Sequence, residues 1–402
     1  MQIQKNELYR FPWSKTDNPG GWIEVTDKCD ISCKGCYRHK LEGHRSIEDI
    51  KNDIVEIKSF TNCDFITVAG GEPLIYPQIF EVVSFISELG LKSIIFSNGE
   101  QFTYDLGVKL RKAGLSKIHF HVDSEQERDG WQGKTEIELN QLRQELADIV
   151  YSIKGLQCGF HVTVYRNRLK EIPNIIDWTL QNTHKVQHIS LIAFRGFPVN
   201  GNLHYYAKGV EIKVSKFNNS SNDAEEINIS TEEIFEQIIS NYPYLNPSAY
   251  LNGTSKFDSY KFLIIARVGS KSKHYGVLGK KTMEFAQVFY HLFFGKYFTF
   301  MNKPNIGKKV FATSLFDKRV RKAFLKFCGL CLRNPMTLFN KTYLQSIHIQ
   351  QPSEILDGKI NMCDDCVNMT VYKGNLVKPC QLDEYRFYGE PLLVMKSDDR
   401  LN

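Results

Sequence analysis

The sequence predicts an α/β protein built on a parallel sheet. Six short runs of apolar and β-branched residues recur along the first half of the chain, and each has the pattern of a buried strand. Segments with the period of an amphipathic helix separate them, and this alternation favours parallel strands joined by right-handed crossovers. The six strands are predicted at residues 22–26, 65–69, 93–97, 117–122, 157–164 and 187–193.

The helices between these strands carry recognisable start signals. Ser46 followed by Asp49 can satisfy the free amide groups of the first helix. A last helix is predicted to begin at residues 230–233, with acids in its first turn, and to run to about Tyr242. The other helices are predicted at residues 75–89, 104–113, 136–153 and 172–181.

Composition indicates a globular protein with a sizeable core. The chain has 402 residues, of which 42% are hydrophobic and 24% charged. Residues 1–5 have no apolar signal-peptide region and no run of about 18 apolar residues occurs, so we predict a cytoplasmic location. In that compartment closely spaced cysteines favour metal or redox sites, whereas the isolated Cys63 and Cys158 are predicted to be buried in the core.

Cys29, Cys33 and Cys36 follow the first strand with C-x3-C-x2-C spacing. Three thiolates at this spacing can hold three irons of a cubane cluster and leave the fourth iron open for chemistry. A zinc site that recruits His39 or His44 as a further ligand is the alternative. We therefore predict a metal centre in this loop, with iron–sulfur favoured over zinc.

Polar residues end the next three strands, at the edge where barrel enzymes place their sites. Gly70 and Gly71 would let a ligand approach the backbone, and Glu72 offers a carboxylate to an ammonium group, although such a sequence can also be a plain turn. Ser97 and Asn98 end the third strand. On the fourth strand His119, His121 and Asp123 alternate, so they should share the interior face, where hydrogen-bonded core histidines are the alternative.

A second cysteine group lies near the carboxyl end of the chain. Cys328 and Cys331 form one C-x2-C pair, Cys363 and Cys366 form another, and Cys380 follows. Five thiols compete for four positions, and Cys363, Cys366 and Cys380 are the better supported. The pattern fits either a closed zinc site or a second iron–sulfur cluster, and we favour a single auxiliary cluster.

The cysteine triple, the Gly-Gly-Glu-Pro sequence at 70–73 and the six β/α units resemble the radical S-adenosylmethionine (radical SAM) superfamily. Gly35 departs from the superfamily pattern, because the usual aromatic residue comes one place after Cys36, as Tyr37. The run from Cys366 through Gly374 to Cys380 resembles the SPASM and twitch extensions, with a gap one residue longer than usual. The resemblance implies a partial (β/α)6 TIM-like barrel with a C-terminal Cys-rich extension.

Three parts of the chain are predicted from this resemblance. Residues 1–242 would be the core barrel, residues 243–345 a basic, aromatic insertion of unknown role, and residues 346–402 an auxiliary metal-binding extension to which Cys328 and Cys331 could contribute. The implied cofactors are a [4Fe-4S] cluster on Cys29, Cys33 and Cys36, S-adenosyl-L-methionine, and a second iron–sulfur cluster or zinc. The implied S-adenosylmethionine contacts are Tyr37, Gly70, Gly71, Glu72, Pro73, Ser97, Asn98, Asp123, Arg166 and Ala193.

The implied activity is reductive cleavage of S-adenosylmethionine to a 5′-deoxyadenosyl radical that abstracts hydrogen from a substrate. A peptide or small natural product ranks first as that substrate, a lipid or isoprenoid at a membrane surface second, and RNA third. A flavodoxin or ferredoxin would supply electrons. The non-enzyme alternative is a zinc-stabilised protein that binds nucleic acid or a membrane.

Residues 271–333 have a strong local excess of positive charge, with fourteen Lys or Arg against two acids, Glu284 and Asp317. Within this segment Phe285, Phe289, Phe293, Tyr297 and Phe300 recur at helical spacing. Core packing is the first interpretation of such a stripe. Peripheral contact with a membrane, or a tunnel for an apolar substrate, is the second, and nucleic-acid binding ranks last.

Overall fold

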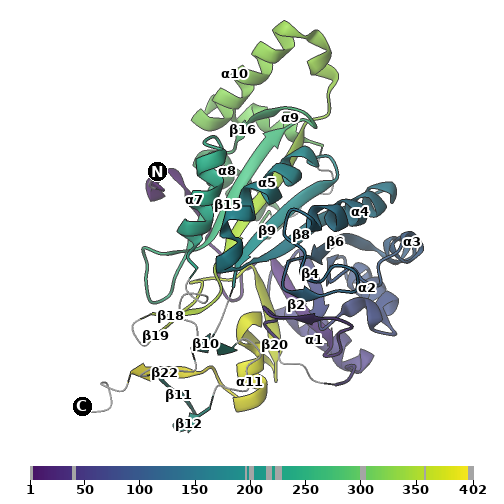
Figure 1. Cartoon of the computed structure of the whole chain (residues 1–402), viewed down its shortest axis with the longest axis vertical. Coiled ribbons are helices and arrows are strands. Elements are labelled where there is room, and N and C mark those ends of the chain that lie inside the picture. The colour runs from purple at the N-terminus through teal and green to yellow at the C-terminus, as the bar shows by residue number, and fades with distance from the viewer. Residues whose placement is uncertain are drawn as a thin grey trace.

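The computed structural model describes residues 3–38, 42–194, 197–198, 203–213, 220–221, 229–298, 305–356 and 359–396. One large sheet forms its centre, and helices pack on its outer side (Figure 1). Six adjacent strands of this sheet are parallel and follow one another in chain order. They are β2 (Gly20–Thr26), β4 (Phe65–Gly70), β5 (Lys92–Ser97), β6 (Leu115–His121), β8 (Gln157–Val164) and β9 (Val186–Ala193). The predicted α/β fold, a partial (β/α)6 barrel, is confirmed.

Helices connect these strands with the predicted caps. The Ser46 hydroxyl accepts a hydrogen bond from the Asp49 amide at the start of α1. Ser230 and Glu233 form a reciprocal capping box at the start of α7. The helices are α1 (Ile47–Phe60), α2 (Ile79–Glu88), α3 (Tyr104–Ala113), α4 (Leu139–Ser152), α5 (Ile172–Gln181) and α7 (Thr231–Asn241).

Two helices begin later than the sequence predicts. Residues 73–75 form a short 3-10 turn, and α2 starts only at Ile79. Pro77 is the physical reason, because proline has no amide hydrogen and disfavours helical geometry at the residue before it. Glu136 lies ahead of α4 rather than within it, and its buried carboxylate accepts a hydrogen bond from the Ser124 amide at 2.8 Å.

The sheet continues beyond the six predicted strands at both edges. β17 (Tyr343–Gln350) pairs in parallel with β9, and β15 (Tyr260–Gly269), β14 (Ala249–Asn252) and β1 (Tyr9–Arg10) extend that edge, with β16 (His274–Val277) on β15. β20 (Asn368–Tyr372) and β21 (Asn375–Val377) extend the other edge beside β2. Residues 243–345 thus supply strands to the central sheet, although the division of the chain into three domains stays a prediction.

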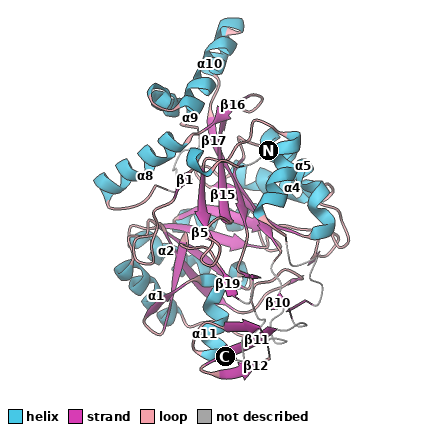
Figure 2. Cartoon of the chain, turned by 90° about the vertical axis from the view of Figure 1, so that its left-hand side faces the viewer, coloured by secondary structure: helices cyan, strands magenta, loops and turns pink. Residues whose placement is uncertain are grey.

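The remaining elements gather at two opposite ends of the molecule (Figures 1 and 2). One end carries α8 (Lys280–Phe294), α9 (Gly307–Val310) and α10 (Lys318–Arg333), and the other carries β11 (Leu203–Ala207), β12 (Val210–Ile212), α11 (Leu382–Tyr388) and β22 (Leu393–Lys396). Short strands are β3 (Ser32–Cys33), β7 (Gln126–Glu127), β10 (Phe197–Pro198), β13 (Ser220–Ser221), β18 (Glu354–Leu356) and β19 (Lys359–Asn361). The 3-10 turns are Lys5–Glu7, Pro73–Ile75, Arg166–Glu171, Phe311–Leu315, Pro335–Phe339 and Pro379–Gln381.

The main core lies between the sheet and the helices α1 to α5 and α7. Cys63 and Cys158 belong to it and are 2% and 1% exposed, which confirms their prediction as core residues. Among the described residues, no helix is both long enough and apolar enough to cross a membrane.

Candidate functional site

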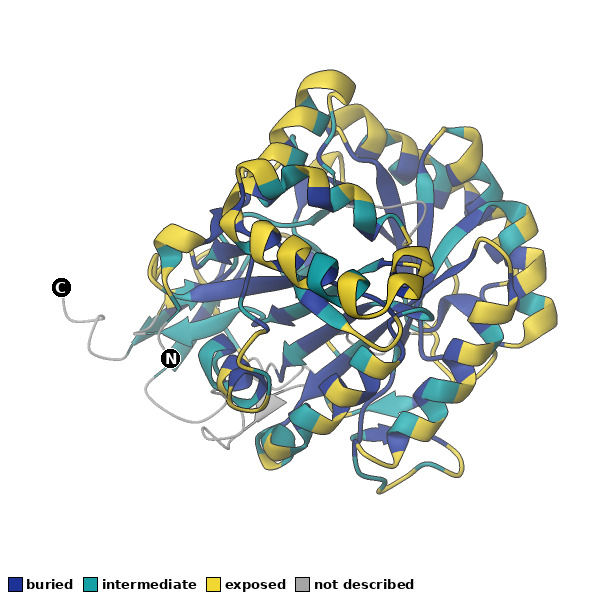
Figure 3. Ribbon diagram, turned by 90° about the horizontal axis from the view of Figure 1, so that it is seen from above, coloured by how far each residue is buried: buried dark blue, intermediate teal, exposed yellow. Residues whose placement is uncertain are grey.

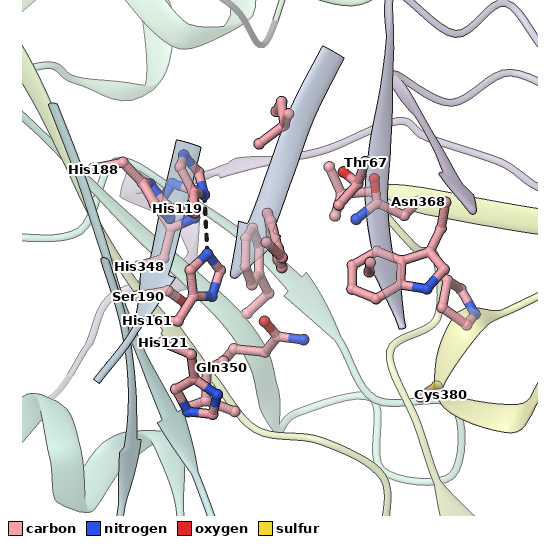
Figure 4. A pocket seen from close by; sticks show the side chains of 18 of the residues that line it. Thr67, His119, His121, His161, His188, Ser190, His348, Gln350, Asn368 and Cys380 are labelled. Carbon is pink, nitrogen blue, oxygen red and sulfur yellow. Dashed lines mark hydrogen bonds between the residues drawn. The ribbon is translucent and has the colours of Figure 1, made fainter. Parts of the chain in front are cut away.

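A cavity of about 560 Å³ occupies the inside of the curved sheet. Cys29, Cys33 and Cys36 line it, and so do Cys363, Cys366 and Cys380. Residues of α8 also line it, through Met283, Ala286 and Gln287. The two predicted cysteine groups therefore face one shared cavity, whose opposite walls carry the histidines and Cys380 in Figure 4.

The loop of Cys29, Cys33 and Cys36 is held by backbone contacts to two strand ends. Cys33 in β3 pairs with Gln126 in β7. The amide of Gly71 donates to the Thr26 carbonyl at 2.7 Å, and the amide of Glu72 donates to the Lys28 carbonyl at 2.8 Å. These bonds bring the end of β4 against the residues just before Cys29.

Gly70 and Gly71 are required for that approach. A Cβ on Gly70 would lie 2.3 Å from the Thr26 carbonyl oxygen, and one on Gly71 would lie 1.9 Å from the Lys28 carbonyl oxygen. Gly70 also has a φ of +131°, which favours glycine. The sequence predicted these glycines as room for a ligand. Both line the cavity, and their immediate steric role is to admit the cysteine loop.

Gly35 stands where the superfamily pattern has an aromatic residue, and the side chain of Tyr165 packs against it. A Cβ at Gly35 would lie 2.7 Å from the hydroxyl oxygen of Tyr165, which is 1% exposed. Tyr165 directly follows β8, so an aromatic group from a distant part of the chain lies beside Gly35.

Glu72 is fully buried and joins the ends of β4 and β5. Its Oε1 accepts hydrogen bonds from the Ser97 hydroxyl at 2.8 Å and the Leu74 amide at 2.9 Å, and its Oε2 accepts one from the Asn98 amide at 2.6 Å. Burial raises the pKa of Glu72 to about 7 despite these bonds. Glu72 does not line the cavity, so its contact with an ammonium group stays a prediction.

Asn98 connects the end of β5 to the first cysteine. Its side-chain amide donates to Asp30 Oδ1 at 2.6 Å and lies 3.8 Å from Cys29 Sγ. Hydrogen bonds to cysteine sulfurs are one means by which proteins adjust an iron–sulfur centre.

The predicted S-adenosylmethionine contacts separate into two groups. Tyr37, Gly70, Gly71, Ser97, Asn98 and Ala193 line the cavity. Glu72, Pro73, Asp123 and Arg166 do not. Asp123 is 2% exposed and lies 2.9 Å from the His121 ring, whereas Arg166 pairs with Glu233 of the α7 capping box.

The five carboxyl-terminal cysteines fall into two groups, three that line the cavity and two that do not. Cys363 and Cys366 precede β20, and Cys380 follows β21, so the β20–β21 hairpin brings the three together. Lys373 and Gly374 form its turn with φ values of +49° and +74°, as a two-residue hairpin loop requires. Cys328 and Cys331 lie on α10, at the other end of the molecule, and do not line the cavity (Figure 1).

The donor chemistry of both groups fits a metal centre. Burial raises the pKa of the thiols of Cys29, Cys33, Cys363 and Cys366. The charged thiolate form is therefore disfavoured at these cysteines unless a cation compensates it, and a coordinated metal does so directly. Of the two candidate histidines for the zinc alternative, His39 lies outside the described residues, and His44 forms a backbone bridge with Thr26 without lining the cavity.

Sequence reasoning missed two features of this site. One is a buried charge cluster in which Glu24 of β2, 1% exposed, pairs with Arg38 and with Arg386 of α11. The other is a set of cavity histidines from β8, β9 and β17, namely His161, His188 and His348, that join the predicted His119. The interior alternation found for His119 and His121 could have revealed His161 and His188 as well, because they occupy neighbouring parallel strands.

Comparison with known proteins gives partial matches. Residues 23–156 match the family model described as Radical SAM superfamily. A probable GTP 3′,8-cyclase of Methanothermobacter marburgensis is 35% identical over 105 residues, covering 25% of this chain and 34% of that protein. The Fe-coproporphyrin III synthase of Methanosarcina barkeri is 26% identical over 184 residues, covering 43% of this chain and 44% of that protein. The chain thus spans less than half the length of either relative.

Two solved structures are also similar. Streptococcus suis SuiB bound to the precursor peptide SuiA has a TM-score of 0.41 and 13% identity, covering 57% of this chain and 46% of that chain. Native anSMEcpe with bound AdoMet and the Cp18Cys peptide has a TM-score of 0.40 and 12% identity, covering 56% of this chain and 60% of that chain.

Proposed function

We propose that the chain is an enzyme that cleaves S-adenosylmethionine reductively at a [4Fe-4S] cluster. The cleavage would give a 5′-deoxyadenosyl radical that abstracts hydrogen from a substrate, and the match of residues 23–156 to the Radical SAM superfamily model supports this proposal. The observation that carries the proposal is the meeting of Cys29, Cys33 and Cys36 with the ends of β4 and β5 at one cavity. Gly70, Gly71, Ser97 and Asn98 would position the cofactor there. When bound there, the cofactor would supply the radical chemistry, and these residues would orient it.

Release of 5′-deoxyadenosine tests this proposal. Anaerobically reconstituted protein, incubated with dithionite and S-adenosylmethionine, should release 5′-deoxyadenosine, and Cys29→Ala should abolish the release. Cys63→Ala is the matched control, because Cys63 is a buried core cysteine away from the cavity. Iron-free, colourless protein that retains only zinc after reconstitution would overturn the proposal in favour of the zinc-stabilised binding protein.

We assign a second iron–sulfur cluster to Cys363, Cys366 and Cys380. Their gathering by the β20–β21 hairpin supports it, and zinc is the alternative. The triple variant of Cys29, Cys33 and Cys36 to Ala separates the two, because about four irons per chain should remain if the auxiliary centre is a cubane cluster. Zinc in place of iron would contradict the assignment. A flavodoxin or ferredoxin is the proposed electron donor.

For the substrate, a peptide or small natural product is our first proposal. A cavity of about 560 Å³ lies within the range that proteins use for small ligands. The curated relatives bear the names of a GTP cyclase and a coproporphyrin synthase, so their names favour no single substrate. Untargeted comparison of cell extracts before and after turnover, with Cys29→Ala as control, should reveal the consumed compound.

A lipid at an anionic membrane surface is the second candidate, and the outer faces of α8 and α10 favour it. Phe285, Phe289 and Phe293, predicted first as core, are 47%, 46% and 62% exposed, so that interpretation is wrong for them. Tyr297 alone of the described stripe is buried, and Phe300 lies outside the described residues. Other exposed apolar side chains of this end are Leu292, Phe294, Leu315, Leu325, Leu332, Met336, Leu338 and Phe339.

Exposed cations surround this apolar surface. They include Lys280, Lys281, Lys309, Lys318, Arg321, Lys322, Lys326 and Arg333. Figure 3, which views the molecule from above, shows exposed segments on the helices that face the viewer, with intermediate and buried segments between them. An apolar surface bordered by Lys and Arg fits a bilayer with anionic headgroups. Because the opposite face of α8 lines the cavity, a membrane-bound enzyme would place its cavity close to a lipid substrate.

Sedimentation with liposomes tests this candidate. The protein should bind phosphatidylglycerol vesicles at low salt, and binding should fall in 1 M salt, where the screening length is about 3 Å. Leu292→Glu with Phe293→Glu, and separately Arg321→Glu with Lys322→Glu, should weaken binding. Val55→Glu, at an exposed apolar position on α1, should not. Equal binding by all four proteins, or none by wild type, would rule the candidate out.

A further inference from the structure

Three imidazoles meet on one wall of the cavity. His119 comes from β6, His161 from β8 and His188 from β9, and one ring nitrogen of each lies within 4.8 Å of those of the other two. Figure 4 shows the three rings together on the wall that faces Thr67, Asn368 and Cys380. The group is separate from both cysteine groups, and the radical chemistry proposed above assigns it no role.

The strand register explains why the rings lie side by side, with those of His119 and His188 stacked at 4.7 Å between centroids. His119 and His188 are both register partners of Gly159, so they are neighbours at one level across β8, and His161 lies one interior position further along β8. Gly159 has no side chain to fill the space between them. A Cβ there would lie 2.6 Å from the His119 ring and 3.1 Å from His188 Cβ. The sequence therefore keeps this space for the His119 imidazole.

The ring nitrogens are only partly satisfied. His119 Nδ1 lies 3.0 Å from His161 Nε2, and His188 Nδ1 lies 2.9 Å from the Ser346 hydroxyl. His119 Nε2 is buried with no hydrogen-bond partner. Buried polar atoms are almost always paired, so this nitrogen requires an explanation. A hydroxyl on the far nitrogen of an imidazole, as Ser346 provides for His188, is also how metal-binding histidines are commonly oriented.

The surroundings keep these imidazoles neutral. Burial lowers the pKa of His161 to about 3 and that of His119 and His188 well below the usual value. The nearby His348 has a pKa lowered to about 3 by burial, and its ring packs edge-on against His188 at 4.3 Å. Lys117 is the cation that faces the group, and burial lowers its pKa to about 8. Neutral imidazole is the form that binds metal ions.

We propose that His119, His161 and His188 bind one divalent transition-metal ion, of the zinc or ferrous-iron class, at the wall of the substrate cavity. Three nitrogen ligands are typical of catalytic sites, which keep a coordination position open. The three imidazoles line the same cavity as Cys29, Cys33 and Cys36, so an open position on the ion could take an oxygen or nitrogen atom of the substrate. Contact between the ion and a substrate rests on the proposed function, whereas binding of the ion by the three histidines does not.

Zinc binding by the full-length, cluster-loaded protein tests the proposal. Protein with reconstituted iron is incubated anaerobically with zinc alone and desalted, and zinc and iron are then measured per chain. Wild type should keep about one zinc per chain in addition to its cluster iron. His188→Phe, which fills the same space without a ligand, should lose this zinc. His188→Cys should retain it, because a thiolate is also a zinc ligand.

His184→Phe is the matched control, because His184 is a histidine outside the cavity. Unchanged iron content in every variant shows that the clusters and the fold remain intact. Zinc retained by His188→Phe, or absent from wild type with full iron, would overturn the metal site and leave a hydrogen-bonded histidine cluster. Neither result depends on S-adenosylmethionine cleavage, so failure of the proposed enzyme activity is distinguished from failure of this site.

Discussion

Arg386 Nη1 lies 2.9 Å from the carboxylate of Glu24, a residue of β2 that is 1% exposed. The pair joins α11, which follows the second cysteine group, to the strand that leads into the first. Arg38, two residues after Cys36, contacts the same carboxylate. The two candidate metal centres are therefore connected by one buried cluster of charges.

Removing Arg386 should weaken this connection. Arg386→Met removes one of the two ion pairs of the buried Glu24 carboxylate and leaves Arg38 as the other. We expect the free energy of unfolding to fall by about 2 kcal/mol, which is less than the ~3–5 kcal/mol lost when a buried charge keeps no partner at all. Urea unfolding followed by circular dichroism measures the change. Arg333→Met, at the exposed end of α10, is the control and should leave stability almost unchanged. Equal stabilities of the two variants would contradict a structural role for the Arg386 pair.

Replacing Gly71 should displace the first cysteine loop. A methyl group there would lie 1.9 Å from the Lys28 carbonyl oxygen, so the end of β4 and the residues before Cys29 must move apart. We expect Gly71→Ala to lose the cluster iron of the first site and about 2 kcal/mol of stability, as overpacked substitutions do. Gly329→Ala, on α10 with open space around it, is the control and should keep its iron. Full iron in Gly71→Ala would show that the loop can adjust.

Glu72 should make stability depend on pH. Its pKa is raised from 4.5 to about 7 in the folded protein, so its contribution is fully present below pH 4.5 and is lost as the pH rises to about 7. The loss is about 3 kcal/mol at most, at 1.36 kcal/mol per pKa unit. Urea unfolding at pH 5 and pH 8 should show a larger decrease for wild type than for Glu72→Gln. The same decrease in both proteins would contradict the raised pKa.

The α7 capping box should contribute measurably to stability. Ser230→Ala removes the hydroxyl that accepts a hydrogen bond from the Glu233 amide. We expect the free energy of unfolding to fall by about 1 kcal/mol. Ser230→Asp, which restores an acceptor at the cap, should recover most of it. Thermal unfolding of the three proteins measures the difference, and no change in Ser230→Ala would indicate that Arg166 alone fixes Glu233.

The barrel could be predicted from the sequence because its signals are local. Buried parallel strands such as β4 and β9 are short apolar runs, and the caps at Ser46 and Ser230 lie within one helical turn of the helices they start. Pro77 is also a local signal, and it correctly predicts that α2 begins after residue 77.

What could not be predicted depends on distant residues. β15 and β17 pair with each other across more than seventy positions, and nothing near either strand indicates the partner. Phe285 and Phe289 have the helical spacing of core residues. That spacing alone does not reveal which face of α8 packs against the rest of the fold. The Tyr165 hydroxyl over Gly35 and the Arg386 pair with Glu24 likewise join segments far apart in the chain.

The cavity wall draws on almost the whole chain, from Phe11 and Trp13 to Cys380. During synthesis the loop of Cys29 emerges long before the β20–β21 hairpin that carries the last wall residues. The cavity is therefore incomplete until the β20–β21 hairpin has been synthesised. In the proposed enzyme, the first cysteines would be available to a metal before this wall forms, whereas the cavity for a substrate would be complete only after the carboxyl-terminal hairpin has paired with β2.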